Sequence, residues 1–422
     1  MTTPFPSVRA ARRPKLSRAT SFWLLAAIQL LLLFAASAPS PLYPVYQAQW
    51  GFGATAVTLV FALYAFGLLI ALLLVGSLSD HIGRRPVLIG SLLVEIAAMV
   101  LFIEADGLGW LLVARGVQGL ATGGAMGAIG AGLVDLQPAR NPRLGALVGG
   151  ASILLGLALG GLGSGVLVQY APAPRTLIYL VLVVAFSITL AGTLFMPESA
   201  VRRPGALGSL MPRVSLPPRM RPHIVLTTPS LVALWAVGGF YLSLGPSLTA
   251  TVLGVQNRVL SGVVIAVLTG AGALGQFLLR GRSPLRILST GSVTLGIGML
   301  ITLIGVAATV PSAYLLGTAL AGFGYGASLL GAMRTVAAQA APEERATAFA
   351  VLFLISYLAF GLPAVAAGVF STHLGLIPTS VGYAVAVIAL AVLALAGLAA
   401  RKRRPRAPRS QCACPQPSGR AA

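Results

Sequence analysis

The acid–base chemistry that this sequence offers is concentrated in two residues that stand inside long apolar segments. Glu95 lies in GSLLVEIAAMVLF, and Arg115 lies in WLLVARGVQGLA. A charge in hydrocarbon costs at least about 2.5–3.5 kcal/mol, so each residue is expected to face a partner or a cavity rather than lipid. A carboxyl group in such a place can bind and release a proton, and a nearby guanidinium changes the free energy of that step.

Two interpretations of this pair remain open. Counting along the two helices puts Glu95 about 14 Å from one membrane face and Arg115 about 10 Å from the opposite face. A direct or water-bridged pair is therefore possible. In one interpretation Glu95 exchanges protons and Arg115 sets its affinity for them. In the other, the two residues form a permanent internal ion pair.

The rest of the sequence carries no pattern typical of an enzyme or a metal site. His81, His223 and His373 lie in separate segments, and there is no phosphate-binding loop, zinc-ligand spacing or nucleophile elbow. Cys412 and Cys414 stand near the C-terminal end without a His or a further Cys nearby. We therefore predict no enzymatic activity, no cofactor and no metal. Since nothing in the sequence could hydrolyse ATP, we expect an ion gradient to be the source of energy for the protein's activity.

The elements that must hold Glu95 and Arg115 are membrane-spanning helices. Of the 422 residues, 57% are hydrophobic and only 9% are charged, whereas an ordinary globular protein carries about 25% charged residues. The apolar residues fall into blocks of roughly 18 to 28, the length needed to cross about 30 Å of hydrocarbon. The blocks run over 21–39, 54–76, 86–104, 108–134, 143–168, 175–196, 223–250, 258–280, 284–308, 311–337, 346–370 and 375–400. This pattern predicts an all-α membrane protein with twelve transmembrane helices.

The net charge of +21 indicates membrane topology and not nucleic-acid binding. Of the 29 Lys and Arg residues, twelve fall in the two tails and fourteen in alternate connections between the blocks. Basic residues are enriched on the cytoplasmic side of membrane proteins. We therefore predict a multi-pass protein of the plasma (inner) membrane with both termini cytoplasmic, lipid as its surroundings and no nucleic-acid partner.

The chain divides into two similar halves. The segment GRRPVL at 83–88 is similar to GRSPLR at 281–286, which lies 198 residues later. Each segment stands between the second and third block of its half. A duplicated six-helix unit explains this repeat and predicts two pseudo-symmetric six-helix bundles. The predicted parts are a cytoplasmic N-terminal tail at 1–20, an N-terminal bundle at 21–196, a cytoplasmic linker at 197–222, a C-terminal bundle at 223–400 and a cytoplasmic tail at 401–422.

The loop between the second and third blocks carries the most specific motif. GSLSDHIGRRP, at 76–86, resembles the signature G-x-L-S-D-R-x-G-R-R of the major facilitator superfamily. The matching residues are Gly76, Leu78, Ser79, Asp80, Gly83, Arg84 and Arg85. His81 stands where the family usually has Arg. Together with the twelve spans, the linker and the half-repeat, the resemblance covers nearly the whole chain and implies the fold of that family. It also implies that this motif latches the two halves on the cytoplasmic side when the cavity opens outward.

The residue types of the loop motif also indicate structural roles on physical grounds alone. Gly76 lets another helix cross closely, and Gly83 permits a tight turn. Asp80 is expected to face the N-terminus of the eleventh helix near residue 346, whose dipole favours an anion by roughly 0.3–1 kcal/mol. Arg84 and Arg85 are expected to pair with acids of the opposite half.

Two further motifs resemble elements of proton-coupled members of the family. R-G-V-Q-G at 115–119 is similar to their R-x-x-Q-G element, and this similarity adds Gln118 to the candidate site. The run G-L-A-L-G-G-L-G-S-G at 156–165 is similar to the glycine-rich element of drug and proton antiporters, although Gly161 replaces its Pro. The missing kink removes some support for export. The glycines Gly156, Gly160, Gly161 and Gly165 are equally well explained as a helix-packing face.

The remaining candidates are polar and aromatic side chains inside the predicted helices, where they can face a central cavity. They are Gln29, Tyr64, Gln118, Trp235, Tyr241, Tyr325 and Tyr357. Packing against neighbouring helices or anchoring at the membrane interface explains such residues equally well. The first helix has no acidic residue, which disfavours cationic drugs as substrates.

The resemblance is closest to proton-coupled drug or metabolite efflux proteins. We therefore expect a monomer that exports a hydrophobic or amphipathic small molecule by antiport with protons, through alternating access. Uptake of a metabolite by proton symport or by a uniport mechanism is the alternative. A membrane sensor or scaffold that does not transport is a third hypothesis. The sequence leaves the identity of the substrate open.

Overall fold

The computed structural model describes residues 16–141, 144–200, 204–209, 218–254, 257–341 and 345–403, and these residues form helices and their connections. Both ends of the chain, with Cys412 and Cys414, lie outside the described residues, as do 210–217 of the predicted linker. The elements are α1 (Arg18–Ser37), η1 (Ser40–Leu42), α2 (Tyr43–Trp50), α3 (Ala54–Val75), α4 (Ser79–Ile82), α5 (Arg84–Ile103), α6 (Leu108–Leu136), α7 (Leu144–Tyr170), α8 (Leu177–Leu194), α9 (Ala206–Ser209), α10 (Arg221–Ser243), α11 (Gly245–Leu253), α12 (Arg258–Leu279), α13 (Pro284–Ala307), α14 (Pro311–Ala337), α15 (Arg345–Leu374) and α16 (Leu376–Arg403).

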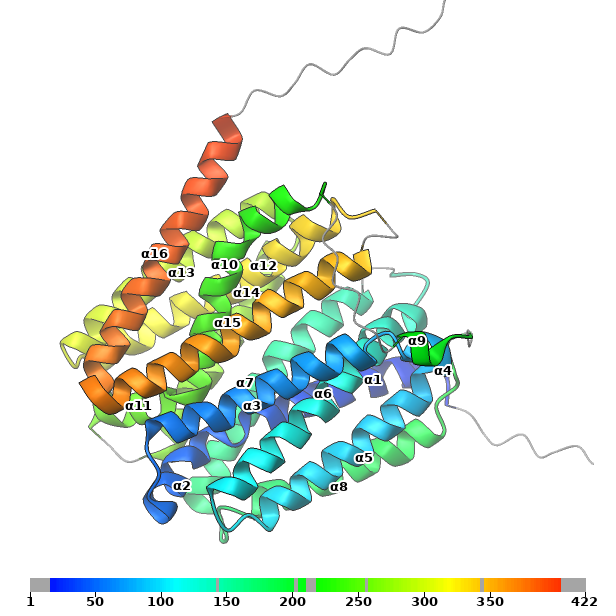
Figure 1. Ribbon diagram of the computed structural model, residues 1–422, viewed down its shortest axis with the longest axis horizontal. Coiled ribbons are helices and arrows are strands. Elements are labelled where there is room, and N and C mark those ends of the chain that lie inside the picture. The colour runs from blue at the N-terminus through cyan, green and yellow to red at the C-terminus, as the bar shows by residue number, and fades with distance from the viewer. Residues whose placement is uncertain are drawn as a thin grey trace, which may run out of the picture.

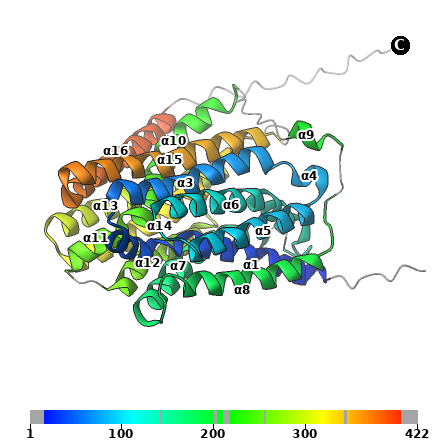
Figure 2. The same cartoon turned by 60° about the horizontal axis from the view of Figure 1, so that its bottom comes forward.

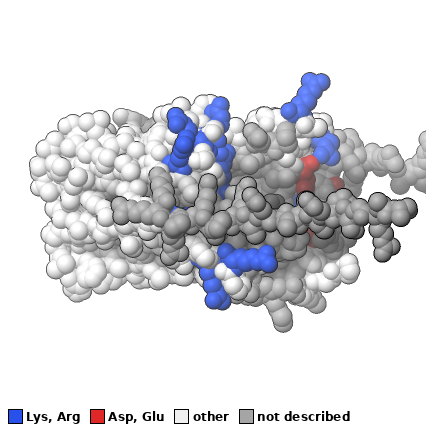
Figure 3. Space-filling model, turned by 90° about the horizontal axis from the view of Figure 1, so that it is seen from above, with Lys and Arg blue, Asp and Glu red and all other residues white. Residues whose placement is uncertain are grey.

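Twelve spans in this part of the chain are long and apolar enough to cross a membrane, which confirms the predicted all-α membrane protein. They form two groups, α1 to α8 below and to the right in Figure 1, and α10 to α16 above and to the left. Each group has its own apolar core, one drawn mainly from residues 22–196 and the other mainly from 220–398. On the face shown in Figure 3, Lys and Arg occur from the middle of the molecule toward its right end, and the left end shows only uncharged side chains.

The first helix of each half is broken near one end. The first span does not stop at residue 39 as the hydrophobic pattern suggested, because the chain continues through η1 and α2 to Trp50. The predicted block at 223–250 is likewise divided at Leu244 into α10 and α11. Proline explains both breaks, since Pro39 and Pro246 have no N–H to donate to a preceding turn.

The internal repeat is visible in how α6 crosses α3 and how α14 crosses α12. A Cβ added to Gly119 would lie 2.3 Å from the carbonyl oxygen of Tyr64, and one added to Gly322 would lie 2.2 Å from that of Leu268. The same contact recurs one turn later at Gly123 and Gly326. Residues 119 and 123 correspond to 322 and 326 at a constant separation of 203, so the two bundles cross their helices in the same way.

The glycine-rich face of α7 serves two different interfaces. Gly156 and Gly160 pack on the backbone of α1 within the first half, where an added Cβ would come within 2.5 and 2.2 Å of a carbonyl oxygen. Gly161 and Gly165 pack on α12 of the other half, and Gly262 of α12 reaches the Gly161 carbonyl in return. The helix α7 runs unbroken from Leu144 to Tyr170 through Gly161, where the antiporter element would have Pro.

The crossing of α14 over α12 predicts a specific cost for a single methyl group. A Cβ at Gly326 would lie 1.9 Å from the Gly272 carbonyl oxygen, so Gly326→Ala must push two helices apart. We expect Gly326→Ala to lower the free energy of unfolding by about 1–3 kcal/mol or more. Thermal unfolding of the purified protein in detergent should therefore have a lower midpoint. Gly270→Ala is the control, because nothing lies within 4 Å of its added Cβ. Equal midpoints for the two variants would contradict the tight crossing.

Candidate functional site

Arg115 is completely buried on α6 and donates hydrogen bonds in three directions. Its Nε and Nη2 donate to the Tyr43 hydroxyl of α2 at 3.1 and 2.9 Å. Its Nη1 donates to the Ala36 carbonyl of α1 at 3.1 Å and to Gln118 Oε1 at 2.6 Å. The guanidinium also lies 4.8 Å from the centre of the Tyr64 ring on α3, within the range of a cation–π contact. The protein therefore compensates the buried cation without a carboxylate in direct contact.

Gln118 joins Arg115 to Glu95. While its Oε1 accepts from Arg115, its Nε2 donates to Glu95 Oε1 at 3.3 Å, and the Thr122 hydroxyl donates to Glu95 Oε2 at 3.5 Å. Among the described residues Glu95 and Arg115 form no direct ion pair. The structure thus brings the predicted pair together through a side-chain amide, and Glu95 itself has no surface exposed.

The spacing along α6 explains why these side chains meet. Arg115, Gln118 and Thr122 lie at i, i+3 and i+7, which puts them on one face of a helix. Gly119 lies beside this face and lets the backbone of α3 come close enough for Tyr64 to cover the guanidinium. The sequence motif indicated Arg115 and Gln118 but not Thr122, although its helical spacing was a usable signal.

The hydrogen bonds to Glu95 are long for an ionised carboxylate. Charge-assisted N–H donors approach a carboxylate oxygen to about 2.7–2.9 Å, whereas those of Gln118 and Thr122 stand at 3.3 and 3.5 Å. A carboxylate buried without strong partners is expensive, and taking up a proton relieves that cost. This arrangement can therefore bind and release a proton at Glu95 while Arg115 keeps its own hydrogen bonds.

A second cluster of candidates is aromatic and lies between α10, α14 and α15. The Trp235 ring lies 5.5 Å from Tyr357, 6.4 Å from Tyr325 and 5.2 Å from Phe360, measured between ring centres. Phe360 in turn meets Phe61 of α3, in the other half, at 4.7 Å. The cluster of Trp235, Tyr325, Tyr357 and Phe360 therefore stands at the interface of the halves.

The other candidates do not join this cluster. Tyr241 lies within the second half, where its hydroxyl shares a hydrogen bond of 2.9 Å with Thr318, and its ring stacks on Tyr314. Thr318 occupies the place that Arg115 has in the first half, at the separation of 203 residues. Gln29 is buried on α1 against Gly149 of α7, and its Oε1 has no hydrogen-bond partner among the described residues.

The loop motif is organised around two acids that the sequence analysis did not select. The Glu198 carboxylate accepts from the backbone N–H of Arg84 at 2.8 Å and of Arg85 at 3.2 Å, and so caps the N-terminus of α5. Gly83 has φ +109°, and a Cβ there would collide with Glu198. Asp135 accepts from Arg84 Nε at 3.4 Å. With only eight acids in the chain, Asp135 near Arg140 and Glu198 near Arg202 were signals available from the sequence.

All these loop contacts lie within the first half and the start of the linker. Arg84 pairs with Asp80 on the short helix α4, and Arg85 donates to the Leu194 carbonyl at the end of α8. The His81 ring nitrogen Nδ1 lies 3.2 Å from the Ser77 carbonyl oxygen. Figure 2 shows α4 beside α9 at this end of the molecule. The predicted pairing of this motif with the opposite half stays a prediction, because residues 342–344, before α15, lie outside the described residues.

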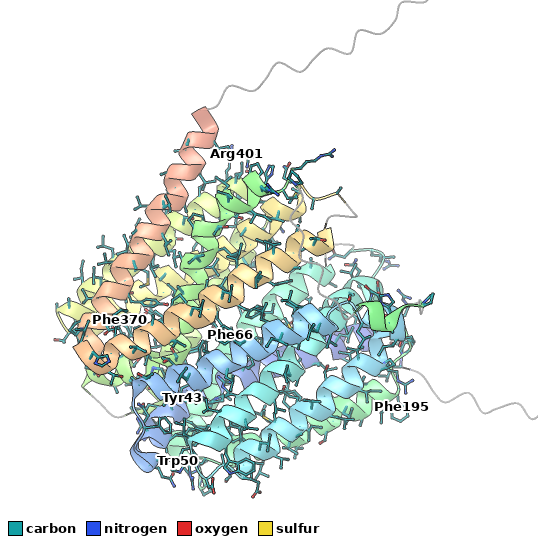
Figure 4. All side chains as sticks on the ribbon, viewed as in Figure 1. Tyr43, Trp50, Phe66, Phe195, Phe370 and Arg401 are labelled. Carbon is teal, nitrogen blue, oxygen red and sulfur yellow. The ribbon has the colours of Figure 1, made fainter. Side chains whose placement is uncertain are left out.

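The halves are hydrogen-bonded to each other at the end away from this loop. The Thr55 hydroxyl, at the start of α3, lies 2.9 Å from that of Thr372 on α15. At the second interface the backbone N–H of Arg258 on α12 donates to Gln169 Oε1 on α7 at 3.0 Å. Nearer the middle, Phe66, labelled in Figure 4, sits on α3 and would touch a Cβ at Gly361 of α15 at 3.4 Å.

Comparison with known proteins gives a consistent result. The model of the Major Facilitator Superfamily matches residues 25–283. Citrate exporter 1 of Aspergillus niger is 34% identical over 97 residues, which are 22% of this chain and 18% of that protein. The match therefore spans less than a fifth of the curated relative.

Solved structures share the fold at low sequence identity. A bacterial homologue of the human lysosomal transporter Spinster, inward-facing and unoccupied, has a TM-score of 0.74 at 15% identity, covering 92% of this chain and 99% of that one. The occupied form of the same homologue has a TM-score of 0.69 at 15% identity, covering 92% and 97%. The human organic anion transporter MFSD10 (TETRAN) has a TM-score of 0.67 at 18% identity, covering 91% and 100%.

Removing the amide of Gln118 should destabilise the protein more than removing an unpaired amide. Gln118→Leu deprives both Arg115 and Glu95 of a partner in a fully buried place, at an expected cost of about 1–3 kcal/mol. Gln29→Leu is the matched control, since Gln29 is buried but its Oε1 is unpaired among the described residues. Thermal unfolding in detergent measures both variants. A smaller effect for Gln118→Leu than for Gln29→Leu would show that the amide does not hold the network.

Proposed function

The chain belongs to the Major Facilitator Superfamily, and from that premise we propose that it exports a hydrophobic or amphipathic small molecule in exchange for protons. It is a multi-pass membrane transporter and not an enzyme. We place it in the plasma (inner) membrane with both termini cytoplasmic, because the tails and alternate connections carry 26 of the 29 basic residues. The monomeric state is proposed from the family alone.

The proposal of proton coupling rests on one observation: Glu95 is an isolated, completely buried acid with weak hydrogen-bond partners. Of the eight acids in the chain, Glu343 and Glu344 lie outside the described residues, and the five others apart from Glu95 lie at helix ends or in connections. A membrane-embedded carboxyl group is costly and therefore suggests a functional role. Its two hydrogen-bond donors, at 3.3 and 3.5 Å, stabilise the carboxylate only weakly, so Glu95 can bind and release a proton.

The network also offers a route from the proton to the interface of the halves. An ionised Glu95 attracts the Gln118 amide, and through it the side of Arg115 that Gln118 accepts from, more strongly than a protonated Glu95 does. Arg115 lies against the ring of Tyr64 on α3. The same helix meets α15 through Phe61 and Phe66. A change of charge at Glu95 can therefore bias the α3–α15 contact, which is the kind of differential interaction that a coupled transition requires.

The hydrogen bonds between the two halves at one end of the molecule are those expected for one state of an alternating-access cycle. Hydrogen bonds at Thr55–Thr372 and Arg258–Gln169 fasten the end away from the basic loops. The loop motif makes its described contacts with the first half and the start of the linker, and none of them reaches the second half. We assign this arrangement to a state closed on the extracytoplasmic side, from which a cytoplasmic substrate is taken up for export.

The direction of transport is the finer part of the proposal. Export is supported by the glycine-rich element and by the partial match to a protein named as a citrate exporter. The unbroken α7, with Gly161 in place of Pro, favours the alternative of proton-coupled or uniport uptake of a metabolite. A static sensor or scaffold is the remaining hypothesis, and it gives no reason for a buried acid.

The role of Glu95 is tested by its neutral isostere. We expect Glu95→Gln to abolish substrate transport driven by a pH gradient in proteoliposomes, since the side chain can no longer exchange a proton, while substrate exchange without a gradient persists. Glu104→Gln is the control, because Glu104 is exposed at the C-terminal end of the same helix. Full pH-driven transport by Glu95→Gln would contradict a role of Glu95 in proton coupling and would favour a permanent structural network.

Closure between Thr55 and Thr372 predicts a reversible covalent lock. In a chain whose Cys412 and Cys414 are replaced by Ser, the pair Thr55→Cys and Thr372→Cys should form a disulfide on mild oxidation, because their hydroxyls lie 2.9 Å apart. Transport in proteoliposomes should stop on oxidation and return on reduction. The two single variants are controls. Unimpaired transport by the cross-linked protein would contradict the assignment of this contact to a gate.

A further inference from the structure

Aromatic side chains form a stripe along α15. Phe349, Phe353, Tyr357 and Phe360 follow one another at intervals of four, four and three residues, the spacing of one helix face. Successive ring centres lie 6.4, 6.5 and 6.5 Å apart, within the range of favourable aromatic contacts. The stripe begins near the start of α15 and ends in the Trp235 cluster.

This stripe faces the inside of the protein and not the lipid. The exposed residues of α15 include Leu358, Leu362 and Val369, which at 100° per residue lie on the opposite side of the helix. On the inward face Tyr357 and Phe360 are buried, whereas Phe349 and Phe353 remain partly exposed. Aromatic surface is therefore accessible from the interior, toward the start of α15.

Three hydrogen-bonding groups around the inner end of the stripe lack protein partners. The Trp235 Nε1–H is buried without an acceptor among the described residues. The hydroxyls of Tyr325 and Tyr357 hydrogen-bond to none of the described residues, although both side chains are more than nine-tenths buried. Of the three groups, the Trp235 Nε1–H is the donor that is both buried and unpaired, which costs about 1–3 kcal/mol, so a ligand that supplies an acceptor here gains affinity.

The surroundings of these groups carry no charge. The stretches 224–243 of α10, 311–333 of α14 and 347–372 of α15 contain no Asp, Glu, Lys or Arg. Among the described residues the buried cation is Arg115, and its Nε, Nη1 and Nη2 already donate to Tyr43, Ala36 and Gln118. An anionic ligand would thus lose its hydration without gaining a counter-charge.

From this combination we infer that the site takes a neutral, planar aromatic compound that bears a hydrogen-bond acceptor. The ring packs on Trp235 and the stripe, and the acceptor receives hydrogen bonds from the Trp235 Nε1–H and the Tyr325 and Tyr357 hydroxyls. The compound approaches along Phe349 and Phe353. This inference rests on the proposed transport function and names its substrate class, which differs from the tricarboxylate in the name of the partial relative.

Binding to the purified protein tests the substrate class directly. Ligands that bind the folded state and not the unfolded state stabilise it by RT ln(1 + L/Kd), where L is the free ligand concentration, and so raise its thermal unfolding midpoint. Three neutral aromatic carbonyl compounds, coumarin, acetophenone and indole-3-carbaldehyde, are compared with octahydrocoumarin, which keeps the lactone acceptor but has no aromatic ring, and with citrate. We expect at least one of the three aromatic compounds to raise the midpoint, and octahydrocoumarin and citrate to leave it unchanged.

Conservative variants assign the effect to the named groups. Trp235→Phe and Tyr357→Phe keep an aromatic ring but remove the donor, and each should weaken binding of the stabilising compound about three- to tenfold. Tyr170→Phe, at an exposed position, is the control and should bind as the wild type does.

Stabilisation by citrate, equal stabilisation by octahydrocoumarin, no shift with any of the aromatic compounds, or unchanged affinity in both donor variants would each overturn the inference. Because binding is measured without a proton gradient, the result is separate from the coupling proposal. Glu95→Gln should still bind the aromatic compound even though it no longer couples transport to protons.

Discussion

The buried guanidinium of Arg115 is the constraint on which the candidate site depends. In a membrane-spanning helix this group cannot reach water, so the protein must supply an acceptor for each of its donating sides. The break after α1 provides two of them. Ala36 lies in the last turn of α1, whose carbonyls lack intrahelical donors, and its oxygen accepts from Arg115. The same break starts α2 at Tyr43, whose hydroxyl accepts twice. A proline-rich interruption of the first span is thus also the element that positions the site.

The two halves share a scaffold but differ in chemistry. Glycines at equivalent positions make the same close crossings in both, at Gly119 and Gly322. In the first half the polar network contains a cation and an acid. In the second half, Thr318 stands in the place of Arg115 and bonds to Tyr241, without any charge. This asymmetry separates the tasks we propose: the first half exchanges the proton, and the second half presents an uncharged aromatic surface to the cargo. The α3–α15 contact joins them through Phe61 and Phe360.

Much of the architecture followed from composition and spacing, because the apolar blocks and basic loops are imposed by the membrane itself. The extension of the first span to Trp50 was missed, since Pro39 resembles a helix end and the short helix beyond it is not strongly apolar. That Glu95 and Arg115 lie near each other was anticipated from their costly burial, but as a direct or water-bridged pair, and the rotation of each helix decides that Gln118 stands between them. Glu198 was overlooked because its role depends on the chain folding back from the end of α8 onto the loop motif, a contact that no local pattern encodes.

The central claim is that Glu95 changes protonation state inside the folded protein. Infrared difference spectroscopy of the purified protein as a function of pH tests this without knowledge of the substrate, because a protonated carboxyl group has a carbonyl stretch that the carboxylate lacks. The account predicts a band that appears on acidification, disappears on return to alkaline pH, and is absent from Glu95→Gln. A wild-type spectrum with no pH-dependent band beyond those of Glu95→Gln would show that Glu95 keeps one charge state, as in a permanent internal ion pair, and would contradict proton exchange at this site.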